Sequence, residues 1–280
     1  MNSNHQKELI VNYGKITNII ISIKSLRESY LTNFYFGEDY CNMCINNKLF
    51  FVIEYEKCIF ILKKDHDFYH LYFFASSKNS LEASLKELLL QYTNYIFIAD
   101  IIGMETLVSE LCSFYEQNDF IKYRKLFRMS RTKNLDEQQL LDERVKTATM
   151  KNAEQIKLLF EKYFDPYSEQ IPLTDEIKKW IETKNIFIIV EKNNVIGFVI
   201  FEIIGMTSYL RYWFTHPEYR DKKIGSALLR RFFHECRATK RQLFWVISSN
   251  ENAIIRYKHY GFEQEQLIDQ IMIRKNNHEK

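Results

Sequence analysis

The sequence has little glycine and proline, with seven Gly and three Pro among 280 residues. Long disordered linkers are usually rich in these residues, so their scarcity argues against such linkers. Hydrophobic residues make up 46% and aromatic residues 15%, which is ample for a core. We therefore expect a compact chain, organised as one large domain or as two of ordinary size.

Membrane and export signals are also lacking. No apolar run approaches the roughly 20 residues that span a bilayer, and the N-terminus has no charged-then-apolar secretory pattern. We expect a cytoplasmic protein without a membrane partner. The five cysteines, an odd number, favour free thiols. Cys41 and Cys44 have metal-ligand spacing, but no second pair follows them, so we predict ordinary thiols and no metal site.

The net charge is small. The sequence has 39 basic and 36 acidic residues, and the resulting net charge of +3 does not predict a nucleic-acid partner. Basic residues do gather at 220–241, which we interpret as local phosphate recognition.

One strand-to-helix junction carries the clearest chemical signal. An apolar strand from Tyr209 to Thr215 ends before Pro217, and helical spacing begins at Ile224. The charged tract 218–223 is therefore predicted at a helix N-terminus, where free N–H groups and the helix dipole favour an anion. Gly225 lets the backbone come close, and Arg220 and Lys222 add positive charge. A pyrophosphate suits this corner.

A solvated charged turn would fit the tract equally well, so a second motif is needed. It follows the next apolar strand, 243–247, and consists of Asn250, Ala253, Tyr257 and Gly261-Phe262. Two motifs in this order and spacing are much rarer by chance than one.

Together these residues resemble the GNAT superfamily of acyl-CoA-dependent N-acyltransferases. The pyrophosphate loop of that family reads Arg/Gln-x-x-Gly-x-Gly/Ala after a strand with Val-x-Pro, and here it reads Arg220-x-x-Lys223-x-Gly225. The departures are Lys223 for the first glycine and Thr215 for the valine. With a negative φ, Lys223 would still offer its N–H to a phosphate, whereas a positive φ would be strained. We expect the loop still to bind a pyrophosphate.

The resemblance implies an α/β (α+β) fold with a mixed, mostly antiparallel sheet flanked by helices. The expected elements of the C-terminal half follow the chain in the family's order. They are strand 145–149, helices 153–164 and 174–183, strands 186–191, 195–203 and 209–215, helix 223–238, strand 243–247, helix 251–260 and strand 267–274.

The N-terminal half has the same order in weaker form. We expect strands 49–55, 58–63 and 69–75, a helix in line with Leu81 to Tyr92, strand 95–101 and a further helix. Tyr115 and Phe120 lie 142 residues before Tyr257 and Phe262, which indicates an internal repeat; a chance echo is the alternative.

The repeat predicts tandem GNAT-like domains at 1–130 and 143–280, joined by linker 131–142. The first half lacks the residues expected to bind acyl-CoA. Ser76–Ser80 has neither the arginine nor the glycine of the loop, and Asp119 replaces the glycine before phenylalanine. We therefore expect one acyl-CoA site, in 143–280. The N-terminal half would shape the acceptor side or cover the site.

The family's mechanism is direct attack of an amine on a thioester, which requires alignment, carbonyl polarisation and protonation of the leaving thiolate. The resemblance makes Tyr257 the general acid, since its phenol would lie beside the sulfur; a packing tyrosine is the alternative. The remaining predicted acyl-CoA contacts are Trp213, Phe214 and Thr215 on the strand, Arg220, Asp221, Lys222, Lys223, Ile224, Gly225 and Ser226 at the loop, and Asn250 and Ala253 beyond it.

The general base and the acceptor are not defined by the sequence. Glu202, Glu218 and His216 are candidates for the base, although His216 also suits a polar cap. Arg211 could recognise a carboxylate-bearing amine or pair with a neighbouring carboxylate. The acceptor is expected to be a small-molecule or peptide amine.

Three functions remain open. The first is transfer of an acetyl or other acyl group from acetyl-CoA to a primary amine. The second is a tandem-type aminoacyl or peptidyl transferase that uses charged tRNA and dispenses with the pyrophosphate loop; Arg220 and Gly225 argue against it. The third is a non-catalytic acyl-CoA-binding module, which Lys223 and the missing base would suit.

Overall fold

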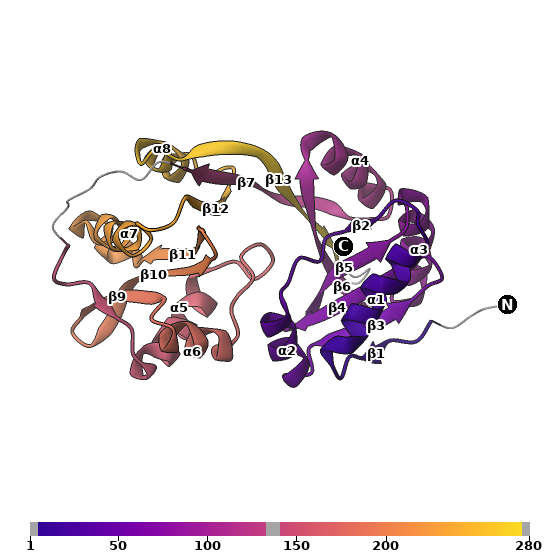
Figure 1. Cartoon of the computed structure of the whole chain (residues 1–280), viewed down its shortest axis with the longest axis horizontal. Coiled ribbons are helices and arrows are strands. Elements are labelled where there is room, and N and C mark those ends of the chain that lie inside the picture. The colour runs from indigo at the N-terminus through magenta and orange to yellow at the C-terminus, as the bar shows by residue number, and fades with distance from the viewer. Residues whose placement is uncertain (1–4, 133–140, 276–280) are drawn as a thin grey trace. The chain divides into compact units, whose positions relative to one another are not determined.

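A computed structural model describes residues 5–132 and 141–275, and Figure 1 traces it from indigo to yellow. The chain forms two compact units, each with a mixed sheet. Unit 1 comprises residues 1–125 and 266–280, and unit 2 comprises 126–265. The expected α/β fold, with a mostly antiparallel sheet and flanking helices, is confirmed.

Unit 1 has the sheet order β1-β3-β4-β5-β6-β13. The neighbours are antiparallel except for β5 and β6, which are parallel. Its elements are β1 (Glu8–Leu9), α1 (Tyr13–Ser25), β2 (Leu31–Thr32), α2 (Glu38–Asn46), β3 (Phe50–Glu54), β4 (Cys58–Asp65), β5 (Phe68–Ala75), α3 (Lys78–Gln91), β6 (Ile96–Met104) and α4 (Glu105–Glu116).

Unit 2 has the sheet order β7-β12-β11-β10-β9-β8, in which β11 and β12 form the parallel pair. Its elements are β8 (Lys146–Thr147), the 3₁₀ helix η1 (Met150–Asn152), α5 (Ala153–Tyr163), α6 (Thr174–Glu182), β9 (Ile186–Glu191), β10 (Asn194–Ile204), β11 (Thr207–Thr215), the 3₁₀ helix η2 (Pro217–Lys222), α7 (Ile224–Glu235), β12 (Arg241–Ile247) and α8 (Glu251–His259). Two long strands belong to both units: β7 (Ile121–Arg131) begins in unit 1 and enters unit 2 at residue 126, and β13 (Glu263–Arg274) begins in unit 2 and enters unit 1 at residue 266.

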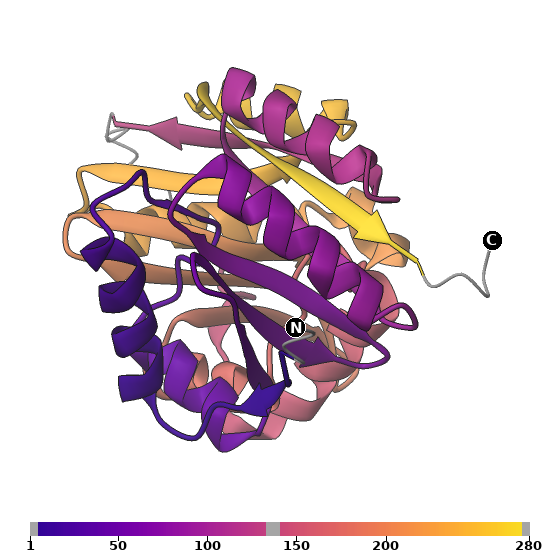
Figure 2. The same ribbon diagram turned by 90° about the vertical axis from the view of Figure 1, so that its right-hand side faces the viewer.

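Two strands cross between the halves of the chain. The end of β7 pairs with β12, so the first half supplies an edge strand to unit 2. In return β13, yellow in Figure 2, pairs with β6 over residues 267–274 and completes unit 1. The compact units therefore differ from the ranges 1–130 and 143–280 expected from sequence, because neither range closes its own sheet. Most of the expected linker, 133–140, lies outside the described residues.

The sheet of unit 2 has a hydrophobic core on each face. Alternate residues of β10 supply both, since Val199 packs with α7 and α8 while Phe198 packs with α5 and α6. Fully buried side chains such as Leu228 and Phe160 each contribute about 1.5–3 kcal/mol. These two cores fix α7 against the sheet and thereby fix the corner at its N-terminus.

The repeat is visible in the turn after α4 and after α8. The N–H of Phe120 donates to Tyr115 O (3.2 Å), and the N–H of Phe262 donates to Tyr257 O (3.1 Å). The residue before each phenylalanine has a positive φ, +65° at Asp119 and +81° at Gly261. The two halves therefore share one turn geometry as well as one order of elements.

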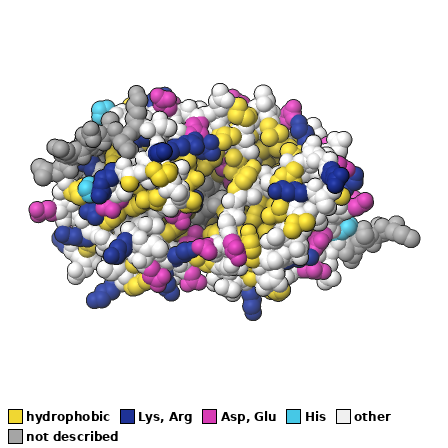
Figure 3. All heavy atoms as spheres, viewed as in Figure 1, with side chains coloured by type: hydrophobic (Ala, Val, Ile, Leu, Met, Phe, Trp, Pro, Cys, Tyr) yellow, Lys and Arg dark blue, Asp and Glu magenta, His cyan; other side chains and the backbone are white. Residues whose placement is uncertain are grey.

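All five cysteines are free and buried. Acidic and basic side chains are interspersed over the face drawn in Figure 3, as expected from the small net charge. None of the helices in 5–132 and 141–275 combines the length and hydropathy needed to cross a membrane.

Candidate acyl-CoA site

The candidate anion site lies where β11 leads through η2 into α7. No side chain caps the N-terminus of α7. The first N–H groups of a helix have no acceptor within it, so those of Ile224, Gly225 and Ser226 are available to a ligand, and the helix dipole favours negative charge there. The sequence analysis placed the tract 218–223 at this position but missed the 3₁₀ helix, whose only sequence signal is Pro217 as its first residue.

Two glycines allow α7 to lie against the sheet. A Cβ on Gly197 would come within 2.7 Å of Ile224 Cγ2, and one on Gly225 would come within 3.0 Å of the Trp213 ring and 3.1 Å of Thr215 Oγ1. Gly225 is buried under these side chains. The absence of a side chain at Gly225 therefore allows α7 to pack on β11. The sequence analysis had instead attributed this glycine to the close approach of an anion.

Lys223 occupies the loop in the left-handed conformation, with φ +59° and ψ +19°. The sequence-based expectation required a negative φ, so the structure differs here: Lys223 has a backbone conformation that glycine, the family's residue at this position, tolerates better than lysine does. A Cβ in this region costs about 1–2 kcal/mol. The loop that precedes α7 therefore contains a strained backbone at Lys223.

The charged side chains of the loop have different surroundings. Arg220 and Lys223 are exposed, as is Asp221. Lys222 instead donates to Glu191 Oε1 (2.9 Å), and this hydrogen bond, followed by one from Tyr219, lowers the pKa of Glu191. The positive charge free to meet an anion therefore belongs mainly to Arg220 and Lys223.

His216 is the N-cap of η2. Its Nδ1 accepts from the Glu218 N–H (3.4 Å), and its Nε2 lies 2.8 Å from Tyr163 Oη. Both ring nitrogens are therefore engaged, which agrees with the polar-cap interpretation rather than with a general base.

The strands β11 and β12 pair only briefly, and we call the unpaired stretch between them the groove of unit 2. The parallel strands β11 and β12 pair only over residues 207–209 and 241–243, although β11 continues to Thr215 and β12 to Ile247. Beyond that point the edge of β11 that faces β12 has no partner strand among the described residues, while its other edge pairs with β10 as far as Thr215. A bulge in the β10–β11 register lies at the same level. An extended chain bearing amide groups could pair with the free edge.

The predicted strand contacts divide between the two faces. Trp213 lies on the α7 side, where its Nε1 donates to Gly225 O (3.0 Å) and ties β11 to the first turn of α7. Thr215 also points there, toward Gly225. Phe214 points to the opposite core, so that only its backbone is available to the groove.

Tyr257 lies on α8 beside this groove. Its ring is 4.1 Å from that of Phe244 and 5.6 Å from that of Trp213, centroid to centroid. Burial raises its pKa, and nearby Arg256 acts in the opposite direction. The hydroxyl makes no hydrogen bond within the described residues. A protonated phenol near neutral pH with a free donor is what an acid for a departing thiolate needs.

Asn250 has a structural task. It is the N-cap of α8, and its Oδ1 accepts from the Ala253 N–H (3.3 Å). Sequence reasoning missed Arg256, whose guanidinium carbon lies 5.9 Å from the Trp213 ring centre. Its place next to Tyr257 in the sequence is no signal for this contact, because consecutive side chains on a helix do not face each other.

The base candidates are unequal. Glu202 accepts from Trp180 Nε1 (3.0 Å) and is ion-paired with Arg211, so Arg211 pairs with a neighbouring carboxylate, the second of its two open interpretations. Glu218 is exposed on η2. Within residues 5–132 and 141–275, neither carboxylate is hydrogen-bonded to Tyr257.

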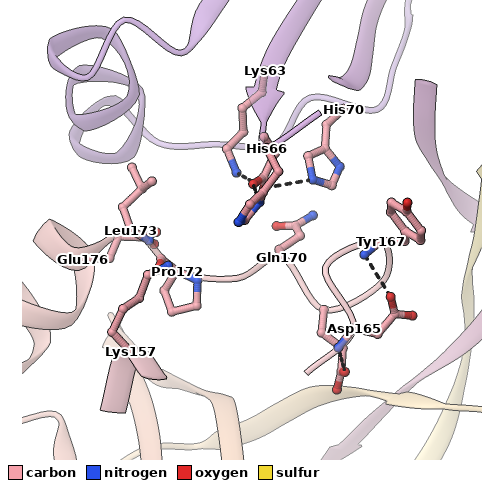
Figure 4. Close-up of polar contacts among 12 residues, drawn as sticks. Lys63, His66, His70, Lys157, Asp165, Tyr167, Gln170, Pro172, Leu173 and Glu176 are labelled. Carbon is pink, nitrogen blue, oxygen red and sulfur yellow. Dashed lines mark hydrogen bonds and ion pairs between the residues drawn. The ribbon is translucent and has the colours of Figure 1, made fainter. Parts of the chain in front are cut away.

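The α5–α6 loop is held to β11 on the face opposite α7. Tyr212 Oη donates to Gln170 O (2.6 Å). Within the loop, Asp165 accepts from the Tyr167 N–H (3.1 Å) and from Ser168 Oγ (2.8 Å), as Figure 4 shows for Tyr167. The loop therefore has a defined local structure.

Comparison with known proteins agrees with this geometry. Residues 153–262 match the family model "Acetyltransferase (GNAT) family". Residues 153–262 form a GNAT domain. The matched range contains β11, the loop, α7 and Tyr257, and so includes every predicted site residue.

Solved structures resemble the whole chain at low identity. A GCN5-related N-acetyltransferase from Sphaerobacter thermophilus has a TM-score of 0.60 at 11% identity, covering 96% of this chain and 95% of its own. A tandem GNAT protein from the clavulanic acid biosynthesis pathway has a TM-score of 0.60 at 10% identity, with 97% and 98% covered. A GNAT-family acetyltransferase from Colwellia psychrerythraea has a TM-score of 0.56 at 12% identity, with 96% and 98% covered. These likenesses establish the fold. No curated protein matches the sequence.

Proposed function

We propose that the protein transfers an acyl group, most simply acetyl, from acetyl-CoA to a primary amine, and that the transfer takes place in unit 2. The observation that carries the proposal is the pairing of an uncapped helix N-terminus with a free strand edge that begins at the same corner. The first suits a diphosphate and the second an extended arm with two amides, and acyl-CoA has these groups in that order.

In this proposal the N–H groups at the start of α7 hold the diphosphate, with Arg220 and Lys223 adding charge. The arm lies along β11 toward Tyr257. The amine attacks the thioester carbonyl, the C–S bond breaks, and the Tyr257 hydroxyl gives its proton to the departing thiolate. Arg256 stabilises the phenolate that results, which then regains a proton from solvent.

The acceptor gives up its proton to water or to a base outside the set named above. Glu202 is held by Trp180 and Arg211, and His216 by the η2 cap, so neither is proposed as that base.

Two measurements test the proposal. Titration calorimetry should detect acetyl-CoA binding, whereas an enzyme that takes its donor from charged tRNA should show none. Thiol release on addition of primary amines should follow binding. Binding without thiol release for any amine would instead indicate a non-catalytic acyl-CoA-binding module.

A further inference from the structure

The groove of unit 1 that corresponds to the candidate site contains a segment of the chain itself. In unit 1 the parallel pair is β5 and β6, which are joined only over residues 68–70 and 96–98 before they separate. This is the same short pairing that opens the groove beside β11. The edge of β5 that faces β6 would therefore be free beyond His70 unless something else paired with it.

Residues 31–33 pair with that edge. The short strand β2 is antiparallel to β5, with Leu31 opposite Ala75 and Thr32 opposite Phe74. Thr32 Oγ1 also donates to Phe73 O (2.7 Å). Because β4 occupies the other edge of β5 along its whole length, β2 must lie on the β6 side.

Asn33 then bridges the gap between the two strands. It is 4% exposed, and its Oδ1 accepts from the Phe73 N–H (2.8 Å) on β5. Its Nδ2 donates to Leu71 O (3.0 Å) on β5 and to Asp100 O (3.1 Å) on β6. One side-chain amide thus satisfies backbone groups of both strands where they part.

The helix corner of unit 1 is also filled from within. The N-terminus of α3 has a reciprocal capping box between Ser77 and Ser80. Beside it, the Glu28 carboxylate accepts from Ser76 Oγ (2.8 Å) and from Lys57 Nζ (2.7 Å). An anionic group therefore lies at the corner where the diphosphate would lie in unit 2.

We propose that the segment Glu28–Asn33 is a built-in substitute for acyl-CoA in unit 1, so that the chain binds one acyl-CoA, in unit 2. The segment has the order of groups that the ligand has: a carboxylate at the helix corner, an extended backbone along the strand and an amide where the strands part. The identity of the ligand it replaces rests on the proposed function above; the occupancy of the groove does not.

Hydrogen exchange with and without acetyl-CoA tests this inference. In the wild-type chain the amides of residues 71–75 should exchange slowly in both conditions, since the segment already covers them. The amides of 210–215 on β11 should exchange faster and slow down on addition of acetyl-CoA. Calorimetry should give one molecule bound per chain. Acetyl-CoA-dependent protection at 71–75, or two molecules bound, would overturn the inference.

A variant separates the segment from its surroundings. Asn33→Ala should speed exchange at Phe73 by at least about tenfold, because its N–H loses its acceptor, and should leave the affinity for acetyl-CoA within about twofold. Asn47→Ala, at the exposed end of α2, is the matched control and should change neither. Unchanged exchange at Phe73 in a folded Asn33→Ala chain would contradict the inference. The wild-type experiment decides alone if that variant does not fold.

Calorimetry and hydrogen exchange give different results for the two units. If calorimetry shows no acetyl-CoA binding, the proposed function falls. If acetyl-CoA binds and protects 71–75, the proposed function stands and the substitute does not.

Discussion

The two units carry the same groove in opposite states. In unit 1 the gap between β5 and β6 is bridged by Asn33, and the adjoining helix N-terminus is capped by its own serines. In unit 2 the gap between β11 and β12 has no pairing strand among the described residues, and α7 has no side-chain cap. One arrangement of strands can therefore have its free backbone groups bonded by the chain itself, as in unit 1, or leave them unpaired, as in unit 2, where we propose that a ligand binds.

The turn that follows each groove is retained in both units, but its tyrosine differs in surroundings. The Tyr115 ring packs edge-on against Phe120 (4.9 Å between centroids), and its hydroxyl is fully buried without a hydrogen-bond partner in the described residues. Tyr257 is also buried and lies edge-on to Phe262 (6.1 Å between centroids), but its ring additionally lies 5.6 Å from that of Trp213 on β11. The same residue type therefore packs in both units, and the catalytic role that we propose for Tyr257 depends on its position beside β11.

The largest expected effect comes from filling the helix corner. Gly225→Val places side-chain atoms against Trp213 and Thr215, moves the start of α7 and should weaken acetyl-CoA binding by at least about 100-fold, or about 3 kcal/mol. Calorimetry measures the loss, and circular dichroism confirms the fold. Ser77→Ala at the equivalent corner of unit 1 is the control and should leave the affinity unchanged. Equal losses in both variants would remove the contrast between the corners.

The tyrosines provide the next test. Tyr257→Phe should lower kcat by about 100-fold with little change in the dissociation constant for acetyl-CoA, since only the acid is lost. Tyr115→Phe removes a buried hydroxyl without a partner and should leave kcat unchanged. Thiol-release kinetics check both. Normal turnover by Tyr257→Phe would assign Tyr257 to packing, as in unit 1.

The exchanged strands differ in how they are anchored. In unit 2, Arg131 on β7 donates through Nε to Gln242 Oε1 (2.7 Å) and through Nη1 to Tyr260 O (2.8 Å), so neutral acceptors hold this strand. In unit 1, burial and then the neighbouring Asp100 raise the pKa of Asp269 on β13 well above its usual value. Unit 1 should therefore be the pH-sensitive partner.

Proton linkage gives the direction in which the stability of unit 1 changes with pH. Folding raises the pKa of Asp269, so its contribution to stability is complete below the unfolded pKa of about 3.9 and is lost as pH rises through the folded value. The slope is at most about 1.4 kcal/mol per pH unit. Denaturant unfolding between pH 4 and pH 8 should show this decline, and Asp269→Asn should flatten it. An unchanged pH profile in that variant would show that Asp269 does not bind the proton.

Nearby, Asp65 behaves in the opposite way. Burial alone would raise its pKa, but His70, Lys63 and His66 outweigh burial and hold the pKa at about 2. Figure 4 shows Lys63, His66 and His70 gathered around this carboxylate. Because it stays ionised above pH 4, Asp65 should not contribute to the decline between pH 4 and pH 8, which leaves Asp269 as the variant to test.

The smallest effect concerns the two residues that adopt a glycine-like conformation. Lys223→Gly should raise the free energy of unfolding by about 0.5–1 kcal/mol, because glycine tolerates φ near +59°. Asp119→Gly should gain less, because aspartate tolerates this region better than lysine. Chemical denaturation compares them. Destabilisation by Lys223→Gly would show that the loop needs the lysine side chain for its own structure.

The sequence predicted the regular elements of unit 2 well because its strands and helices have strong apolar periodicity. The strand expected at 186–191 matches β9, and the helix expected at 251–260 ends one residue later than α8. It also located the loop, Gly225 and Tyr257 through a family pattern whose spacing the chain retains.

Other features could not be read from local pattern. The exchange of β7 and β13 depends on which edge strand finds which sheet, and the pairing of Leu31–Asn33 with β5 depends on contacts about 40 residues apart. The left-handed conformation of Lys223 was missed as well. A left-handed turn is usually recognised in a sequence by its glycine, and this chain, with only seven glycines, has other residues in several such turns. The sequence therefore predicted neither the long-range strand pairing nor the positive φ of Lys223.

A crystal structure grown with acetyl-CoA would show directly which of the two grooves holds the ligand. We expect the diphosphate at the N–H groups that begin α7, the arm along the free edge of β11, and residues 31–33 still paired with β5. Coenzyme A lodged in the groove of unit 1, or an empty corner at α7 with saturating ligand present, would contradict it.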